Sequence, residues 1–175
     1  MANFAEQVVE RLEALGIKRI YGLVGDSLNP LSDAVRESDI EWVHVRNEEA
    51  AAFAAGADSL ATNELAVCGA SCGPGNTHFV QGLFESHRNG AKVLAIASHI
   101  PTAEIGSSFF QETHPEMLFQ ECSSYCEVVH TADQGMRVLH NALQNTLAGN
   151  GVSVMVVPGD VFAADVADGP HTADS

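Results

Sequence analysis

Basic residues are scarce in this sequence. Eight lysines and arginines stand against 23 aspartates and glutamates among 175 residues, which gives a formal net charge of −15. A negative field of this size repels nucleic acid and anionic lipid, so we expect no nucleic-acid partner. Long apolar runs are missing too, since none approaches the roughly 20 residues that a membrane-spanning helix needs. The first 16 residues also lack the basic start and apolar segment of a signal peptide, which predicts a cytoplasmic location.

Cysteines are few, and their spacing does not suit a metal or redox site. The four form two pairs, Cys68 with Cys72 and Cys122 with Cys126. Neither pair has the two-residue gap that is usual for zinc ligands or a redox dithiol. We therefore expect reduced, packed thiols and no metal site in this chain.

The residues that are abundant predict one folded domain. Hydrophobic residues make up 46% of the chain and charged ones 18%, which is enough to build a core. Apolar runs of strand length alternate about six times with segments of helical periodicity, and several runs show no polar alternation, as expected of strands covered on both faces. The predicted strands are 18–24, 40–45, 64–70, 92–98, 124–130 and 152–157. The pattern predicts a three-layer α/β/α sandwich around a mostly parallel sheet of about six strands.

Two segments depart from this alternation. Residues 100–121 contain Gly106, two prolines and few periodic apolar residues, which predicts a long loop with a short helix, and loops of this length are often functional. After Pro158 the chain consists mainly of small and polar residues with little to bury, which is typical of a linker or tail. We place the domain at residues 1–162 and the polar tail, or the start of an interdomain linker, at 163–175.

The carboxyl ends of the predicted strands are the expected place for a ligand. They collect residues 25–27, 46–49, 73–76 and 98–111. In the second of these segments Glu48 opens an alanine-rich helix and shares a face with Ala51, Ala52 and Ala55. An acidic residue in a first helical turn also simply favours the positive end of the helix dipole, so this position alone does not assign a function.

Two short motifs invite other interpretations. Gly25-Asp-Ser-Leu matches the name-giving block of the GDSL hydrolases, with Ser27 as nucleophile and Asp168 and His171 as its partners, although an oxyanion-binding Gly-x-Asn-Asp block is missing. The turn at 73–76 is of the kind that cradles a phosphate, but it has neither the lysine of a P-loop nor the three glycines of a dinucleotide fold. A tight strand-to-helix turn is the simpler interpretation of that stretch.

Taken together, six segments resemble a known family. In order along residues 3–162, they are similar to the N-terminal pyrimidine-binding domain of thiamine diphosphate enzymes, and most similar to the pyruvate dehydrogenase (quinone) and pyruvate oxidase group. The segments are 21–29, 46–56, 72–78, 87–89, 110–115 and 157–160.

This resemblance implies roles for individual residues. Glu48 would hydrogen-bond N1′ of the cofactor's aminopyrimidine and favour the imino form of its 4′-amino group, the base that deprotonates C2. The alanines beside Glu48 would exclude water from that contact. The aminopyrimidine would be lined by Val24, Gly25, Gly73, Pro74, Gly75 and Asn76, and the thiazolium and substrate side would be reached by Phe110, Gln111 and His87.

The resemblance also implies components that this sequence lacks. Such enzymes convert pyruvate to acetate and carbon dioxide and pass electrons to FAD and then to quinone. They hold the diphosphate and Mg²⁺ on a separate domain with a Gly-Asp-Gly motif, which does not occur here. We therefore expect a diphosphate-binding domain, usually from another subunit, as partner, a homo-oligomer, and a complete enzyme compatible with peripheral attachment to the inner membrane face. A noncatalytic interaction domain, or the small subunit of a split 2-oxo acid decarboxylase, is the remaining alternative.

Overall fold

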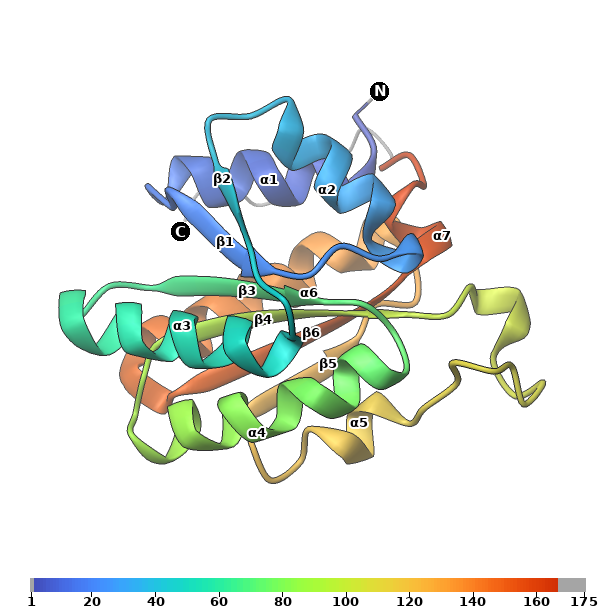
Figure 1. Cartoon of the computed structure of the whole chain (residues 1–175). Helices are drawn as coiled ribbons and strands as arrows, with labels where there is room; N and C mark the ends of the chain where they lie inside the picture. Colours follow the sequence, from blue (N-terminus) through green and yellow to red (C-terminus); the bar gives the residue numbers. More distant parts are fainter. Residues whose placement is uncertain (1, 167–175) are drawn as a thin grey trace.

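The computed structural model describes residues 2–166, and these fold around a six-stranded sheet in which every pairing is parallel (Figure 1). The strand order is β2-β1-β3-β4-β6-β5. The strands are β1 (Arg19–Gly22), β2 (Glu41–His44), β3 (Ala66–Ala70), β4 (Val93–His99), β5 (Tyr125–Val128) and β6 (Val152–Pro158). All six predicted strands are confirmed, with bounds that differ by no more than two residues.

The buried strands lie in the middle of the sheet. Every residue of β3, β4 and β6 is buried, whereas the edge strands β2 and β5 carry half-buried and exposed side chains. The continuous apolar runs arise because helices cover both faces of a parallel sheet. The last strand of the chain, β6, is inserted between β4 and β5 and pairs with β4 from Val93 opposite Val152 to His99 opposite Pro158.

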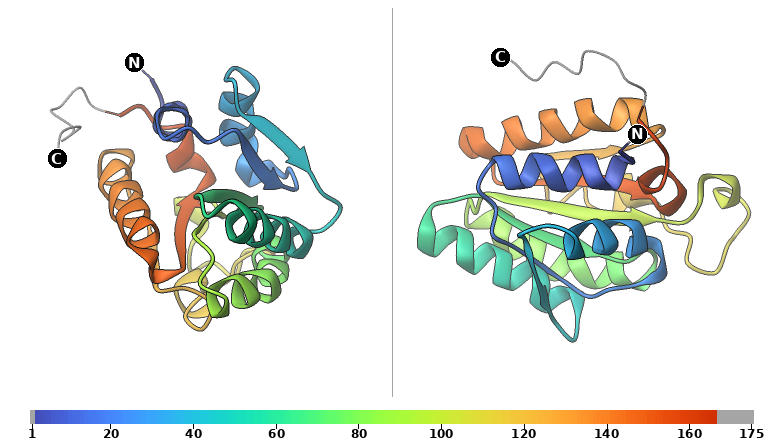
Figure 2. Two further views of the ribbon diagram at one scale, coloured as in Figure 1. Left: turned by 90° about the vertical axis from the view of Figure 1, so that its left-hand side faces the viewer. Right: turned by 90° about the horizontal axis from the view of Figure 1, so that it is seen from above.

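Helices form the two outer layers and confirm the three-layer fold (Figure 2). α1, α2, α6 and α7 pack on one face, and α3, α4 and α5 pack on the other. The helices are α1 (Phe4–Ala14), α2 (Asn29–Arg36), α3 (Glu48–Thr62), α4 (Pro74–Arg88), α5 (Pro115–Leu118), α6 (Ala132–Asn145) and α7 (Gly159–Phe162). None of the helices within residues 2–166 combines the length and the apolarity needed to cross a bilayer.

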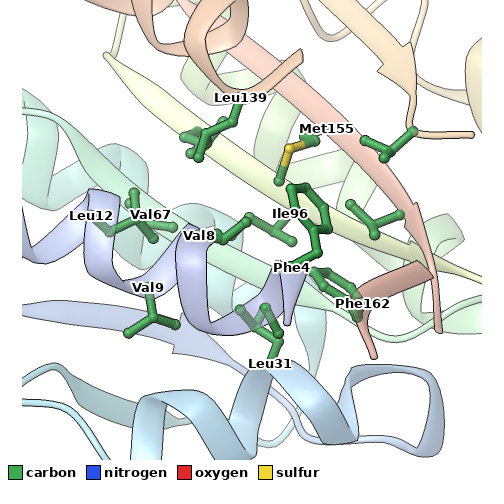
Figure 3. Packing of buried hydrophobic residues seen from close by; sticks show 14 of the residues in the cluster. Phe4, Val8, Val9, Leu12, Leu31, Val67, Ile96, Leu139, Met155 and Phe162 are labelled. Atoms are coloured by element: carbon green, nitrogen blue, oxygen red, sulfur yellow. The ribbon is translucent and has the colours of Figure 1, made fainter. Parts of the chain in front are cut away.

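The larger core lies under α1. Val8 and Leu12 point from α1 toward Ile96 and Val67 of the sheet, as Figure 3 shows. Phe4 at the start of α1 stacks on Phe162, with ring centroids 6.1 Å apart. Such burial of aromatic and aliphatic side chains is the main source of stability for this face.

The end of the described chain belongs to this core. Phe162 and Val166 are buried, and the backbone N–H of Phe4 donates to the carbonyl of Ala164. The prediction that the chain has little to bury after Pro158 is therefore wrong for α7 and for Val166. The boundary placed after residue 162 stays a prediction, and residues 167–175 lie outside the described part.

The four cysteines are free in the described structure, as expected of packed thiols. Burial raises the pKa of Cys122 to about 11 and that of Cys126 to about 12. Burial also raises the pKa of Cys68, which is fully enclosed in β3. At neutral pH these three side chains are protonated and serve as small apolar groups.

Candidate functional site

The loops after β1 and β3 leave the sheet in opposite directions. β1 pairs with β2 on one side and with β3 on the other, α2 packs on one face of the sheet, and α4 packs on the opposite face. Ligands of parallel-sheet proteins bind at such a switch point, at the carboxyl edge of the sheet, and we call the edge between these two loops the crevice. The two loops touch there, and a methyl group on Gly25 would clash with the side chain of Ser71. Only glycine permits this approach.

Glu48 stands beside the crevice as the first residue of α3. The helix begins there because the side chain of Asn47 caps it, accepting a hydrogen bond from the backbone N–H of Glu49 at 2.8 Å. Glu48 is only 6% exposed although it is an acid, and Ala51 and Ala52 on the same helix are fully buried. A buried carboxyl group normally requires a partner, so this position suggests a functional site rather than a solvated helix start.

The carboxyl group of Glu48 faces two parts of α4. Its Oε2 lies 3.2 Å from Nδ1 of His78, a side chain that is about half exposed. Its Oε1 faces Gly75, where a methyl group would come within 2.9 Å. One oxygen is therefore engaged by a histidine, and the other faces backbone that carries no side chain.

The turn before α4 has the shape of a cradle. Gly73 adopts a φ of +67°, and a side chain there would meet Gln111 at 2.8 Å. Pro74 takes the first position of the helix, where its missing N–H costs nothing. Asn76 is completely buried and donates from Nδ2 to the carbonyl of Ser98 at 2.8 Å, which ties the turn to the end of β4.

The structure brings most of the sequence-predicted site residues to this edge. Close packing brings Gly25 against Ser71, Gly73 against Gln111 and Gly75 against Glu48. The predicted cofactor-side residues Pro74 and Asn76 belong to the same turn, and Val24 is half exposed in the loop after β1.

Phe110 and Gln111 lie on the loop that follows β4, which extends away from the body of the domain in Figure 1. Gln111 contacts the crevice, because its Oε1 lies 3.6 Å from Cys72 Sγ. Phe110 is 83% exposed and packs on Phe109, with ring centroids 4.8 Å apart. An aromatic ring this exposed is available for contact with another domain.

The structure does not bring His87 to this edge. It lies near the carboxyl end of α4, where a methyl group on Gly151, just before β6, would sit 2.9 Å from its Nδ1. His87 follows Pro74 by thirteen positions of the helix, a rise of roughly 20 Å. His87 is thus placed at the opposite edge of the sheet and contributes nothing to the crevice.

His78 is the histidine that sequence reasoning missed. It follows Gly75 by three residues in α4, and in a helix this spacing puts both on one face. That helical spacing was the available signal, but it required knowing that α4 packs against the start of α3.

Glu112 holds the loop that carries Phe110. Its carboxylate accepts hydrogen bonds from the backbone N–H groups of Gly106 and Ser108. The bond from Gly106 lowers the pKa of Glu112 most; bonds from Ser108 and Phe109 add to the effect, while desolvation opposes it. The depressed pKa means that the charged carboxylate stabilises the folded loop.

This arrangement predicts a loop that loosens only in acid. A carboxylate with a depressed folded pKa contributes stability above its unfolded pKa of about 4.3 and loses it as pH falls through the lower folded value. We expect the amide resonances of Gly106 and Ser108, followed by NMR, to titrate with a midpoint below 4.3. The titration should disappear in Glu112→Gln. A midpoint at or above the value of free glutamate would contradict this assignment.

A buried glutamate facing a glycine cradle at the switch point of a parallel sheet defines a cofactor-binding domain of the α/β class. The family model described as "Thiamine pyrophosphate enzyme, N-terminal TPP binding domain" matches residues 2–120. This match spans more than half of the chain, and the chain belongs to that family.

Individual relatives agree with the family. A protein of Pseudomonas amyloderamosa named "Uncharacterized 42.6 kDa protein in isoamylase 3'region" is 57% identical over 164 residues, which cover 92% of this chain and 41% of that protein. Pyruvate oxidase of Lactiplantibacillus plantarum is 33% identical, covering 88% of this chain and 26% of its own length. Acetolactate synthase isozyme 2 large subunit of Escherichia coli is 30% identical, and the match covers 93% of this chain and 30% of that protein. The chain thus spans between about a quarter and two fifths of the length of these relatives.

Proposed function

We propose that this chain is the cofactor-activating domain of a thiamine diphosphate- and FAD-dependent enzyme that oxidises pyruvate to acetate and carbon dioxide and passes the electrons to quinone. The observation that carries the proposal is the buried carboxyl group of Glu48, which packs against the backbone of Gly75 at the carboxyl edge of the sheet. Pyruvate oxidase is among the relatives, which supports pyruvate as substrate.

The described residues fit the pyrimidine half of thiamine diphosphate. A side chain at Gly25, Gly73 or Gly75 would clash with Ser71, Gln111 or Glu48, so these glycines let the segments pack closely, and Glu48 offers a desolvated acid beside their backbone. When bound, the cofactor supplies a carbon nucleophile that attacks 2-oxo acids. Glu48 would hold a proton at N1′ of the pyrimidine, and His78, in contact with its second oxygen, would orient the carboxyl group.

The rest of the enzyme would come from partners. We propose that a diphosphate-binding domain, from a second copy of the complete protein, covers the crevice and brings the diphosphate and Mg²⁺, and that a further domain holds FAD. The exposed ring of Phe110 beside Gln111 is a suitable contact for that covering domain, and this favours a homo-oligomer. A cytoplasmic enzyme at the inner membrane face would then meet pyruvate and quinone.

The hydrolase interpretation receives no support from the geometry at Ser27. Its hydroxyl group contacts Ser71 and Ser98 and accepts from the backbone N–H of Cys72. No histidine forms a hydrogen bond with this hydroxyl among residues 2–166. Asp168 and His171, the proposed partners, lie outside the described residues.

A turnover assay tests the proposed function. The complete protein, supplied with thiamine diphosphate, Mg²⁺ and FAD, is expected to reduce a soluble quinone analogue in the presence of pyruvate and to release acetate. The 175-residue chain alone should show no turnover, because the diphosphate-binding half is missing. Acetolactate as the main product, in keeping with the acetolactate synthases among the relatives, would refute the quinone assignment. Turnover by the short chain alone would refute the need for a partner domain, and absence of cofactor binding in the complete protein would favour a noncatalytic interaction domain.

A further inference from the structure

Three serine hydroxyl groups meet beneath the crevice. Ser27 Oγ lies 2.6 Å from Ser98 Oγ and 3.0 Å from Ser71 Oγ, and it accepts from the backbone N–H of Cys72 at 3.1 Å. Ser98 is fully buried. These serines come from three segments: the loop after β1, the loop after β3 and the end of β4. One side chain, Ser27, therefore contacts both of the others.

The direction of each hydrogen bond follows from counting protons. A hydroxyl group has one proton to donate and two lone pairs to accept with. Ser98 Oγ donates its proton to the carbonyl of Ala70 at 3.1 Å, so it must be the acceptor in its contact with Ser27. Ser27 therefore donates its only hydroxyl proton to Ser98, and in the contact between Ser27 and Ser71 the donor is Ser71. With one donated and two accepted bonds, the hydroxyl group of Ser27 is saturated.

This saturation excludes Ser27 as a nucleophile in the described geometry and gives it another role. The hydroxyl of a serine nucleophile must pass its proton to a general base, but here that proton is held by Ser98. The same bonds tie the backbone of Cys72, immediately before Gly73, to the chain two residues after Gly25. The hydroxyl group of Ser27 thus links the two glycine segments, in addition to the direct packing of Gly25 on Ser71.

We infer that Ser27 is a positioning residue, whose hydroxyl group fixes the Gly73–Gly75 turn relative to the loop after β1 and so sets where the turn would meet the cofactor's pyrimidine beside Glu48. The inference rests on the proposed function. It also assigns a role to the Gly-Asp-Ser-Leu motif, which the hydrolase interpretation left unexplained. Asn76 holds the other end of the turn to Ser98, so a change at Ser27 acts on a segment that is fixed at one side only.

Removing the hydroxyl group has a defined local effect. In Ser27→Ala the N–H of Cys72 loses its side-chain acceptor and Ser71 loses its own, while Ser98 keeps its bond to Ala70. Three hydrogen bonds are lost in all, those from Cys72 and Ser71 and the one to Ser98, and if binding must restore the position of the turn at a cost of about one hydrogen bond, the ligand is held about tenfold less tightly. We expect that weakening in the apparent affinity for thiamine diphosphate.

The experiment compares variants of the complete protein. Ser27→Ala is expected to raise the apparent Kd for thiamine diphosphate about tenfold and to slow C2 proton exchange of the cofactor at saturation, because the ring is bound less accurately. The matched control is Ser32→Ala, whose hydroxyl group bonds only to the carbonyl of Asn29 in its own helix and should change neither value. A purely structural role would lower the melting temperature without changing exchange at saturating cofactor.

A double-mutant cycle separates the network from three independent serines. Ser27→Ala combined with Ser71→Ala should cost no more than Ser27→Ala alone, since the bond between them is already lost. Additive losses, or an unchanged Kd and exchange rate in Ser27→Ala, would overturn the inference. If Ser27→Ala does not fold, Ser71→Ala is tested alone. We expect it to weaken the affinity for thiamine diphosphate by less than tenfold, and an unchanged affinity would overturn the inference.

Failure of the proposed function gives a different pattern. If the complete wild-type protein bound no thiamine diphosphate, the proposed function would be refuted, and so would the part of this inference that concerns cofactor affinity. The local part is measured independently on the 175-residue chain, where Ser27→Ala should speed amide hydrogen exchange at Cys72, Gly73 and Gly75 and leave α1 and α2 unchanged. If Ser27→Ala left every amide exchange rate at its wild-type value, the hydrogen-bond assignment itself would be overturned.

Discussion

Glu48→Gln in the complete enzyme is expected to slow C2 proton exchange of bound thiamine diphosphate by about a hundredfold or more. Glutamine keeps the size and one acceptor oxygen of the side chain, but it has no acidic proton to share with N1′ of the pyrimidine. The neighbouring Ala51, Ala52 and Gly75 have no contact that requires a charge, so the change falls on N1′ and on the contact with Nδ1 of His78. Proton exchange at C2, followed by NMR after rapid mixing with D₂O, measures the effect directly.

The matched control is the neighbouring acid. Glu49→Gln changes the same charge in the same first helical turn, but Glu49 is less buried and its backbone N–H, not its side chain, forms the cap with Asn47. We expect exchange close to the wild-type rate in that variant. Retained exchange in Glu48→Gln, or an equal loss in both variants, would assign the activating role elsewhere.

Gly82→Ala should destabilise the domain by about 2 kcal/mol, because α3 and α4 are packed too closely to admit a methyl group. A methyl group at Gly82 would lie 2.6 Å from Ala52 Cβ and 2.8 Å from both the carbonyl oxygen of Glu49 and the backbone N of Phe53. Two of these three atoms belong to the backbone and cannot rotate away. The helices must therefore separate, which also moves Glu48 relative to Gly75.

The sign of this effect is not obvious from helix propensity. Replacing a helical glycine by alanine favours the helix by about 1 kcal/mol when the position is open. Overpacking a tight contact costs about 1–3 kcal/mol, and the contacts at Gly82 are on the severe side because they involve backbone. Packing therefore outweighs propensity here.

Thermal and denaturant unfolding of the 175-residue chain checks this prediction. A loss of about 2 kcal/mol corresponds to a melting temperature lowered by about 4–8 °C in a domain of this size. Gln81→Ala, at an exposed position of the same helix, is the control and should change stability little. A Gly82→Ala protein as stable as wild type would show that the two helices can part without cost.

The strands and most helices were predictable from local pattern. β3 and β4 appear in the sequence as short apolar runs without alternation. Asn47, followed by two acids and a run of alanines, predicts the start of α3. Segment identity was thus visible because periodicity and capping act over a few neighbouring residues. The burial of Phe162 and Val166 was not visible, because their partners lie at the other end of the chain: Phe162 stacks on Phe4, and the N–H of Val166 donates to the carbonyl of Ala2.

The candidate site shows the same division. Glu48 and the glycines of the 73–75 turn were identified by residue type and order, and their meeting follows from the rule that strands of a parallel sheet end at one edge. The choice between two histidines on α4 was not available in that way. His87 and His78 lie on one helix, and only the packing of α4 along α3 decides that His78 reaches the carboxyl group of Glu48 while His87 lies beside Gly151.

By itself the sequence determined the α/β alternation, the family and the acid that opens α3, because each depends on residues close together along the chain. Tertiary structure alone decided which side chains share the crevice, from the contact between Glu48 and His78 to the saturated hydroxyl group of Ser27. The physical reason is that a hydrogen bond depends on position to within a few tenths of an ångström. Positions of that accuracy are set by how helices of particular lengths pack across the sheet, and no local pattern encodes them.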